Sequence, residues 1–176
     1  MTGSRIVVLI VLWLSFGSLA LSAQNVRSAM TPQDLTGEWS LVSQESSLAR
    51  DKRKIDQQMR ISVRENELTI FIRTEDENGF TERSFVYLTD GRGETNRWTS
   101  ETGIVIERKT KTSWKKGMLT TKGSYKINDG TMDTEDRCRL SNDLQKLDCE
   151  QTHRRPGTRS MPIALGFTTR LVYKRM

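Results

Sequence analysis

The sequence is poor in the residues that most often carry metal and redox chemistry. Its 176 residues include two cysteines and one histidine, and no Cys-x-x-Cys pair occurs. A single histidine, His153, nearly excludes a histidine-rich metal site, so no metal ligands and no cofactor are expected. The motif Gly-x-Ser-x-Gly is also missing, and no Gly-rich phosphate loop follows a strand and opens a helix. We therefore do not expect the protein to be an enzyme, and we assign no catalytic residue.

Long helical patterns are missing as well, since no amphipathic segment is long enough to connect parallel strands. Short alternating apolar runs recur instead, at roughly ten-residue spacing with turn residues between them. The expected strands are 39–43, 59–64, 68–73, 81–88, 94–100, 104–110, 119–127, 132–140, 147–153 and 167–175. This spacing is typical of an all-β meander, either a barrel or a sandwich. We expect an up-and-down antiparallel barrel of about eight to ten strands.

Only the N-terminus carries a long hydrophobic run. Arg5 precedes the uninterrupted apolar stretch 6–14, and small residues fill 15–23, which is the layout of a signal peptide. A membrane anchor is the alternative, but a spanning helix needs about 20 mostly apolar residues. The predicted organisation is a signal peptide over 1–23, a flexible lead-in over 24–35 and a barrel domain over 36–176. The mature protein is then exported, periplasmic or secreted, with no stable membrane span.

The charge is positive but mixed. The chain has a net charge of +6, and without its first 23 residues it keeps 27 Lys and Arg against 22 Asp and Glu. This balance favours an anionic surface or polymer as partner, whereas the interleaved acids make nucleic acid an unexpected one. The basic clusters are Arg50–Lys54, Lys109–Lys116 around Trp114, and His153–Arg155 with Arg159. An aromatic among cations can hold an anionic polymer, although a solvated face explains the same pattern.

Several short motifs resemble a group of exported bacterial lipocalin-like β-barrels. Gly37 and Trp39 match the Gly-x-Trp opening strand, and the matching segments that follow are Ser46–Ser47, Asp90–Asn96, Arg139–Leu147 and Tyr173–Arg175. One departure is Asp143-Leu144, because the group usually has Asp-Gly at this turn. The resemblance covers residues 34–176 and implies a barrel that binds a small apolar or amphipathic ligand.

The alternation of side chains predicts a contact between the first and the last strand of the barrel. In an up-and-down barrel with an even number of strands, the last strand closes antiparallel against the first. Trp39, Leu41 and Ser43 alternate along the first strand, and Tyr173 and Arg175 share one face of the last. Arg175 is then expected over Trp39 at the closed end, as in the Arg–Trp lid that the resemblance implies, with Gly37 allowing close approach. An ordinary core tryptophan without an arginine partner is the alternative.

The two cysteines fit one hairpin register. If Leu140 opposes Leu147, Cys138 opposes Cys149, so a structural disulfide is predicted. In the chain-entropy model, closing this loop is worth about 3 kcal/mol. The same register pairs Asp136 with Gln151 and Thr134 with His153 on the cysteine face. These four are candidate ligand-binding residues if the face lines a pocket. A satisfied buried network and a solvated barrel rim are the alternatives.

Three functions are compatible with these features. The first is a non-catalytic exported barrel that binds a small apolar or amphipathic ligand. The second is an envelope-surface module with a filled core whose basic loops contact anionic polymer or lipid headgroups. The third and weakest is an enzyme on a lipocalin-like barrel. The paired carboxylates Asp133/Glu135 and Asp148/Glu150 fall on faces that look outward, so we interpret them as solvated charges.

Export is directly testable. We expect the mature protein to begin between Leu21 and Gln24, because the small residues that end the apolar run are suited to cleavage. N-terminal sequencing of protein from the exported fraction checks this. Recovery of Met1, or retention in the membrane fraction, would contradict a cleaved signal.

Overall fold

The protein folds into ten antiparallel strands. The structure is a computed structural model that describes residues 29–47, 55–76, 79–100, 103–127, 130–157 and 165–176. A 3-10 helix η1 (Pro32–Leu35) precedes the strands, which are β1 (Gly37–Ser46), β2 (Asp56–Arg64), β3 (Glu67–Asp76), β4 (Gly79–Leu88), β5 (Glu94–Thr99), β6 (Val105–Lys115), β7 (Met118–Ile127), β8 (Gly130–Leu140), β9 (Lys146–Arg155) and β10 (Leu165–Arg175). They form one sheet in the order β4-β3-β2-β1-β10-β9-β8-β7-β6-β5.

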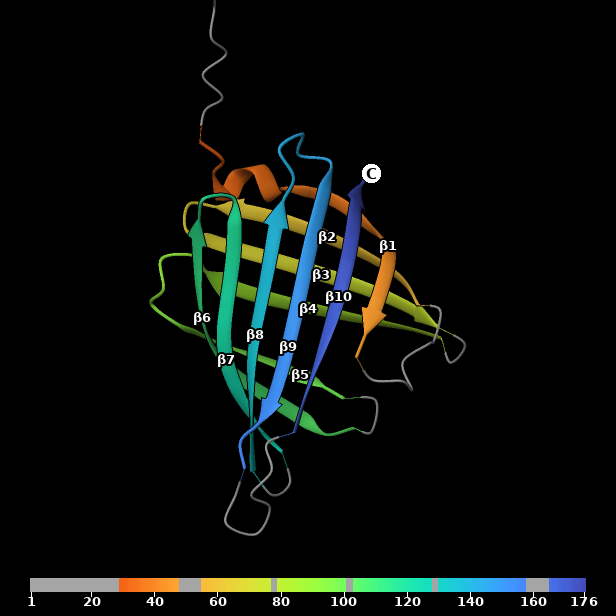
Figure 1. Cartoon of the computed structure of the whole chain (residues 1–176), viewed down its shortest axis with the longest axis vertical. Helices are drawn as coiled ribbons and strands as arrows, with labels where there is room; N and C mark the ends of the chain where they lie inside the picture. The colour runs from red at the N-terminus through yellow and green to blue at the C-terminus, as the bar shows by residue number, and fades with distance from the viewer. Residues whose placement is uncertain (1–28, 48–54, 77–78, 101–102, 128–129, 158–164) are drawn as a thin grey trace, which may run out of the picture.

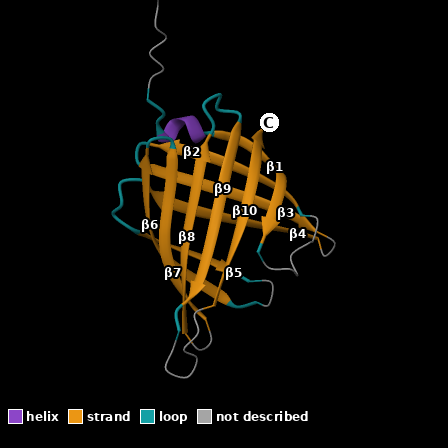
Figure 2. Cartoon of the chain, in the orientation of Figure 1, coloured by secondary structure: helices purple, strands orange, loops and turns teal. Residues whose placement is uncertain are grey.

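The sheet curls into an up-and-down barrel. Figure 1 shows β6 to β10 running steeply across the front, while β2, β3 and β4 cross behind them. Strands make up most of the described chain, and η1 sits over one end (Figure 2). The first and last strands pair antiparallel, as an even strand count requires. The predicted all-β meander barrel is therefore confirmed.

β1 forms a corner of the barrel. It pairs with β2 only over Gly37–Ser40 but follows β10 along most of its length. A bulge lies between Leu41 and Ser43, where Val42 has no partner on β10 and is 59% exposed. The extra residue reverses the faces of the strand. Ser43 is consequently exposed, and the expectation that it shares a face with Trp39 and Leu41 is wrong.

The core gathers at the end of the barrel below η1. Inward residues of nearly every strand meet there because side chains alternate between the two faces of a strand. The buried apolar members are Leu35, Trp39, Met59, Ile61, Leu68, Tyr87, Leu119, Leu140, Leu147, Cys149, Leu171 and Tyr173. This cluster supplies the hydrophobic stabilisation of the fold.

The segment before β1 is ordered in part. The expectation of a flexible lead-in does not hold for residues 30–35, because Pro32–Leu35 form η1, Thr31 caps it and Met30 contacts the barrel. The Asp34 carboxylate accepts a hydrogen bond from the Thr31 N–H at 2.7 Å, and Leu35 is fully buried. Trp114 Nε1 donates to the Met30 carbonyl at 3.1 Å. Alternation of side chains could not predict the contact between Trp114 and Met30, because the two residues are 84 positions apart in the sequence.

Some predicted features lie outside the described residues. These are the signal peptide over 1–23, the first part of the lead-in, the basic cluster Arg50–Lys54 and Arg159. Within the ranges that the structure describes, no helix has the length and apolar character needed to cross a membrane.

The two edges of the sheet meet at a seam between β4 and β5. Side chains bridge this β4–β5 seam where a backbone ladder would normally run. The Asn96 side-chain amide accepts from the Val86 N–H and donates to the Val86 carbonyl, both at 2.8 Å. Next to it, Glu94 Oε2 accepts from the Leu88 N–H at 3.2 Å. Two side chains on β5 thus take the place of strand pairing.

Close approach of β6 and β7 depends on Gly123. A Cβ there would lie 2.3 Å from the Lys109 carbonyl oxygen and 2.5 Å from Thr110 Cγ2. We expect Gly123→Ala to lower the free energy of unfolding by about 1–3 kcal/mol, the usual range for overpacking. Equilibrium urea unfolding followed by tryptophan fluorescence measures it. Gly130→Ala is the control, because its nearest atom would be Arg155 Nε at 3.7 Å. Equal stabilities of the two variants would contradict the steric argument.

Candidate functional site

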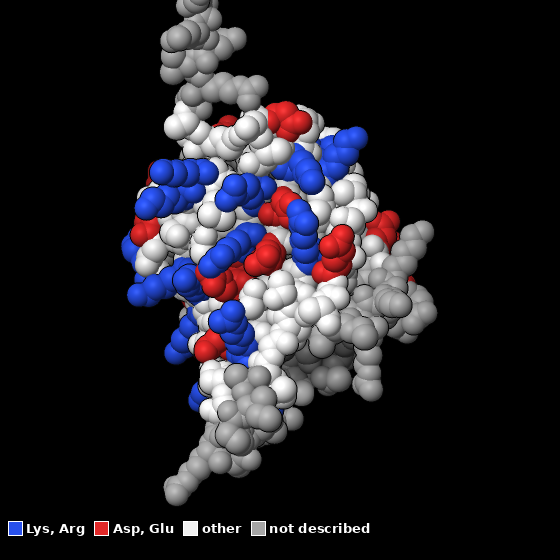
Figure 3. All heavy atoms as spheres, viewed as in Figure 1, with Lys and Arg blue, Asp and Glu red and all other residues white. Residues whose placement is uncertain are grey.

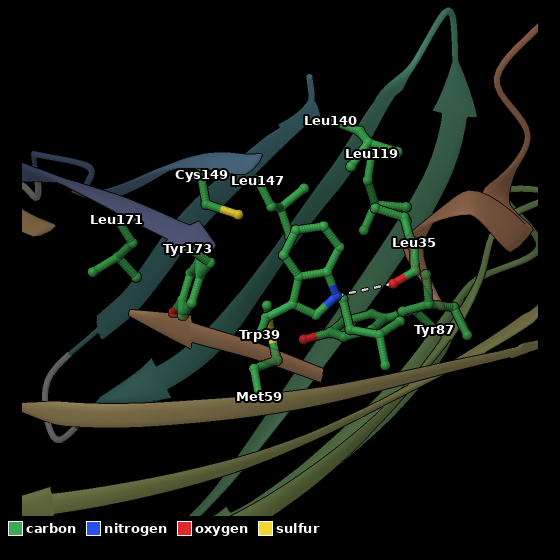
Figure 4. Close-up of a cluster of buried hydrophobic side chains, with 12 residues drawn as sticks. Leu35, Trp39, Met59, Tyr87, Leu119, Leu140, Leu147, Cys149, Leu171 and Tyr173 are labelled. Atoms are coloured by element: carbon green, nitrogen blue, oxygen red, sulfur yellow. Dashed lines mark hydrogen bonds between the residues drawn. The ribbon is translucent and has the colours of Figure 1, made fainter. Parts of the chain in front are cut away.

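The end of the barrel that carries η1 is closed by Trp39; we call it the plug end. Trp39 is fully buried, and Figure 4 shows its ring surrounded by Leu147, Met59 and Tyr87. Its Nε1 donates to the Leu35 carbonyl at 3.0 Å. Arg175 faces it across the β1–β10 pair, and the guanidinium carbon lies 4.5 Å from the centre of the ring. The indole is thus sandwiched between apolar side chains and a cation.

The same guanidinium holds three backbone carbonyls. Arg175 Nε donates to Leu144 at 2.8 Å, Nη1 to Thr36 at 2.9 Å and Nη2 to Asp34 at 2.5 Å. Gly37 permits this, because a Cβ there would lie 3.2 Å from Arg175 Nη1. The plug end is therefore filled by the chain itself. Space for another molecule inside the barrel has to be sought toward the opposite end.

The four candidate ligand residues do face the interior. The predicted register is confirmed, with Thr134 opposite His153 and Asp136 opposite Gln151. Cys138 and Cys149 are paired in this register and joined by a disulfide, as predicted. Thr134 is buried, while Gln151 and His153 are partly exposed. The disulfide thus separates the apolar core from a more polar stretch of the same two strands.

Arg108 on β6 joins this polar stretch and was missed from the sequence. Its Nη2 lies 2.8 Å from Asp136 Oδ2, and its Nε donates to Thr134 Oγ1 at 2.9 Å. Only 12% of the Arg108 side chain and 15% of the Asp136 side chain are exposed. Such an ion pair loses much of its hydration and depends on its hydrogen bonds for compensation. The sequence did hold one signal for its inward position: Arg108 shares a strand face with Thr110 and Thr112, which also point inward.

Six rings form a continuous arc around this ion pair. Successive ring centres are 6.3, 5.7, 6.2, 6.4 and 4.6 Å apart. In order, the aromatic arc consists of Tyr87, Phe85, Trp98, Tyr125, His153 and Phe167. All six share the inward face of their strands, yet only Tyr87 is buried and the other five are partly exposed. Five of these inward rings are therefore not completely covered by other side chains.

His153 is a neutral member of the arc. Its imidazole stacks on the Phe167 ring, with an angle of 7° between the two planes. Burial lowers the pKa of His153, while Asp136 opposes that shift and Arg108 adds to it. Its Nδ1 is buried and has no hydrogen-bond partner among the described residues. At neutral pH the ring therefore adds aromatic surface rather than positive charge.

The charges around Tyr87 are mostly negative. Burial raises the pKa of the Tyr87 phenol. The positive charge of Arg108 lowers this pKa, and the negative charges of Asp136 and Glu94 raise it further. Glu94 is fixed in place, since its Oε1 accepts from Thr110 Oγ1 at 2.7 Å and from Thr112 Oγ1 at 2.9 Å. One cation and two carboxylates thus act on this part of the interior. Burial also raises the pKa of Tyr125, so both phenols stay protonated.

A hollow of about 400 Å³ lies at the β4–β5 seam. Arg83 and Ser84 of β4 line it together with Arg97 and Trp98 of β5. Trp98 also belongs to the aromatic arc and contacts Phe85 across the seam. Trp98 is therefore the member of the arc that lines this hollow.

Other sequence candidates lie apart from this interior. The Asp148 carboxylate faces outward and pairs with Arg170, whose hydrogen bond lowers the pKa of Asp148. Glu135 similarly pairs with Arg137. Trp114 packs against the core instead of standing among the lysines of β6. Of the two explanations for this basic cluster, its position favours the solvated face over a surface for stacking. Among the described residues, no group of three or more His, Cys, Asp or Glu could hold a metal ion.

Comparison with known proteins shows the fold alone. No protein-family model and no curated protein sequence matches the chain. Human cRBP IV is similar with a TM-score of 0.50 and 16% identity, over 82% of this chain and 100% of that one. Secretory abundant heat soluble protein 4 from Ramazzottius varieornatus reaches 0.50 and 15% identity, over 85% and 99%. These neighbours support a lipocalin-like β-barrel fold.

The Trp39–Arg175 contact generates a stability prediction. Trp39→Ala should lower the free energy of unfolding by about 3–5 kcal/mol because it empties the plug end. Arg175→Ala should cost about 2–3 kcal/mol, more than a cation–π contact alone, since three carbonyls lose a charged donor. Urea unfolding of both single variants and the double variant gives the coupling energy. Arg175→Lys, which keeps the charge but not the fork of donors, should fall between wild type and Arg175→Ala. Additive losses within about 0.3 kcal/mol would show that the two side chains act independently.

Proposed function

We propose that the protein is a non-catalytic carrier or sensor that binds a small apolar or amphipathic molecule inside the barrel. One observation carries this proposal: five inward rings of the aromatic arc keep exposed surface, whereas the plug end is packed. Ligand sites typically combine apolar and aromatic walls with a few polar groups. We take the seam hollow beside Trp98 as the route of access from outside.

The interior offers that combination of groups. The arc supplies ring faces for stacking, and such aromatic pairs are worth about 0.5–1.5 kcal/mol each beyond area burial. Arg108 on β6 and Asp136 on β8 supply polar atoms, and their side chains meet across the intervening strand β7. Of the candidate residues, Thr134 orients Arg108, and Gln151 and His153 complete the wall. The ligand-binding role of these residues is part of the proposal.

Export completes the proposed function. The disulfide between Cys138 and Cys149 is compatible with an oxidising compartment, and a cleaved signal over 1–23 would deliver the chain there. Membership of the exported bacterial lipocalin-like group rests on the Gly37–Trp39 opening and the motifs that follow it. A periplasmic or secreted binder of small molecules is the combined proposal.

A second function is favoured by an uneven distribution of charge. Strands β6 to β10 carry 14 Lys and Arg against 6 Asp and Glu, whereas β1 to β4 carry 4 against 7. Figure 3 views the face over β6 to β10, where blue side chains outnumber red ones. Such a face attracts anionic polymer or lipid headgroups, most strongly at low salt. This surface contact could accompany ligand binding or replace it.

Binding of a neutral fluorescent probe tests the first function. N-phenylnaphthylamine should bind the purified protein with enhanced fluorescence, because the arc offers a dry aromatic wall. Tyr125→Ala, which removes a ring in the middle of the arc, should weaken binding about tenfold, equivalent to ~1.4 kcal/mol. Phe80→Ala is the matched control, since that ring is 62% exposed and lies outside the arc.

Two results would redirect the proposal. Equal loss in Tyr125→Ala and Phe80→Ala would place the probe on the surface rather than in the interior. Absence of probe binding, with salt-sensitive binding to anionic vesicles or heparin, would favour the second function. Native mass spectrometry of protein from its own exported fraction adds an independent readout, because a bound natural ligand raises the mass.

A further inference from the structure

We propose that the interior site selects a neutral, flat-ringed ligand and rejects carboxylates, with Asp136 as the residue that sets this preference. The inference rests on the proposed ligand-binding function and names the class of ligand. Its basis is an arginine of β6 that lies beside the arc. The Nη2 atom of this residue, Arg108, is 2.8 Å from Oδ2 of Asp136, so the cation already has a carboxylate partner in the protein.

Two of the three guanidinium nitrogens of Arg108 are bonded to protein groups. Nη2 contacts Asp136 and Nε contacts Thr134, whose hydroxyl in turn donates to the Gly123 carbonyl at 3.1 Å. A ligand carboxylate would have to compete with Asp136 in a site where both partners are largely shielded from water. Removing hydration from an anion without giving it a full countercharge is strongly unfavourable. The pair therefore acts as a neutral polar unit toward a ligand.

The surrounding charges increase this discrimination. Glu94 places a second carboxylate near Tyr87, where it is held by Thr110 and Thr112. His153 supplies no compensating cation, because burial lowers its pKa. Arg83 faces the seam hollow, at the outer end of the site. A carboxylate deep in the arc would meet more negative than positive charge.

The arc suits a neutral ring system. Its rings follow one another at 4.6–6.4 Å across β4, β5, β7, β9 and β10, so a flat molecule can contact several of them. Tyr125 lies directly opposite Arg108 on the β6–β7 pair. Its protonated phenol can donate to, or accept from, a neutral hydroxyl or carbonyl of the ligand. Shape and hydrogen bonding thus favour a neutral aromatic ligand with a polar end.

Two pyrene probes that differ only in their polar end test the inference. Wild-type protein is titrated at neutral pH with pyrenebutanol and with pyrenebutyrate, and pyrene emission and calorimetry give the dissociation constants. We expect the alcohol to bind at least about tenfold more tightly. Asp136→Asn should shift the ratio by at least about tenfold toward the carboxylate, because it leaves Arg108 without its countercharge.

Glu135→Gln is the matched control. It makes the same acid-to-amide change on the adjacent residue of β8, where the side chain faces outward and pairs with Arg137 and Lys122. Its alcohol-to-carboxylate ratio should equal that of wild type. An equal shift in both variants would mean that overall charge, not the Arg108–Asp136 pair, sets the preference, and would overturn the inference.

The remaining outcomes separate the inference from the function on which it rests. If wild type binds the carboxylate as well as the alcohol, the inference fails and ligand binding stands. If neither probe binds, the proposed function fails. If Asp136→Asn does not fold by circular dichroism, the double variant Arg108→Gln/Asp136→Asn replaces it and should keep the preference for the alcohol. Tight carboxylate binding by that double variant would also overturn the inference.

Discussion

The contact of Arg175 with Trp39 is the constraint on which the rest of the barrel depends. One guanidinium covers the buried indole and holds carbonyls of Asp34, Thr36 and Leu144. These carbonyls belong to η1, to the link into β1 and to the turn between β8 and β9. A cation with a rigid fork of donors can do this, whereas an ammonium cannot reach all three directions at once. Strand closure, helix docking and turn conformation are therefore fixed together at the plug end.

Packing one end densely allows the other end to be polar. The apolar cluster around Trp39 provides hydrophobic stabilisation, and the disulfide adds a covalent link where the core ends. Beyond it, Asp136 and Arg108 form a buried ion pair whose desolvation cost rarely favours stability. A fold tolerates such a pair when other regions supply the stability and when the pair serves recognition. The division of the interior into a packed half and a polar, ring-lined half follows from this balance.

Local patterns predicted much of this fold, and long-range contacts account for what was missed. The β8–β9 register followed from placing Leu140 against Leu147, and it brought Thr134 and His153 together. Arg108 reaches Asp136 across 28 residues. Alternation with Thr110 and Thr112 places Arg108 on the inward face of its strand, but it does not identify Asp136 as the partner. The bulge at Val42 and the docking of Leu35 likewise depend on closure of the barrel. Alternation identifies faces, but it does not identify partners on non-adjacent segments.

The β4–β5 seam links the architecture to the chemistry of the interior. Because no backbone ladder closes it, Glu94 bonds the Leu88 N–H with one oxygen and two threonine hydroxyls with the other. Those bonds hold the carboxylate close to Tyr87. The group that helps to close the barrel therefore also makes this part of the interior negative. A seam joined by backbone alone would leave Arg108 and Asp136 as a balanced pair, whereas this seam adds a second carboxylate, Glu94, to the same part of the interior.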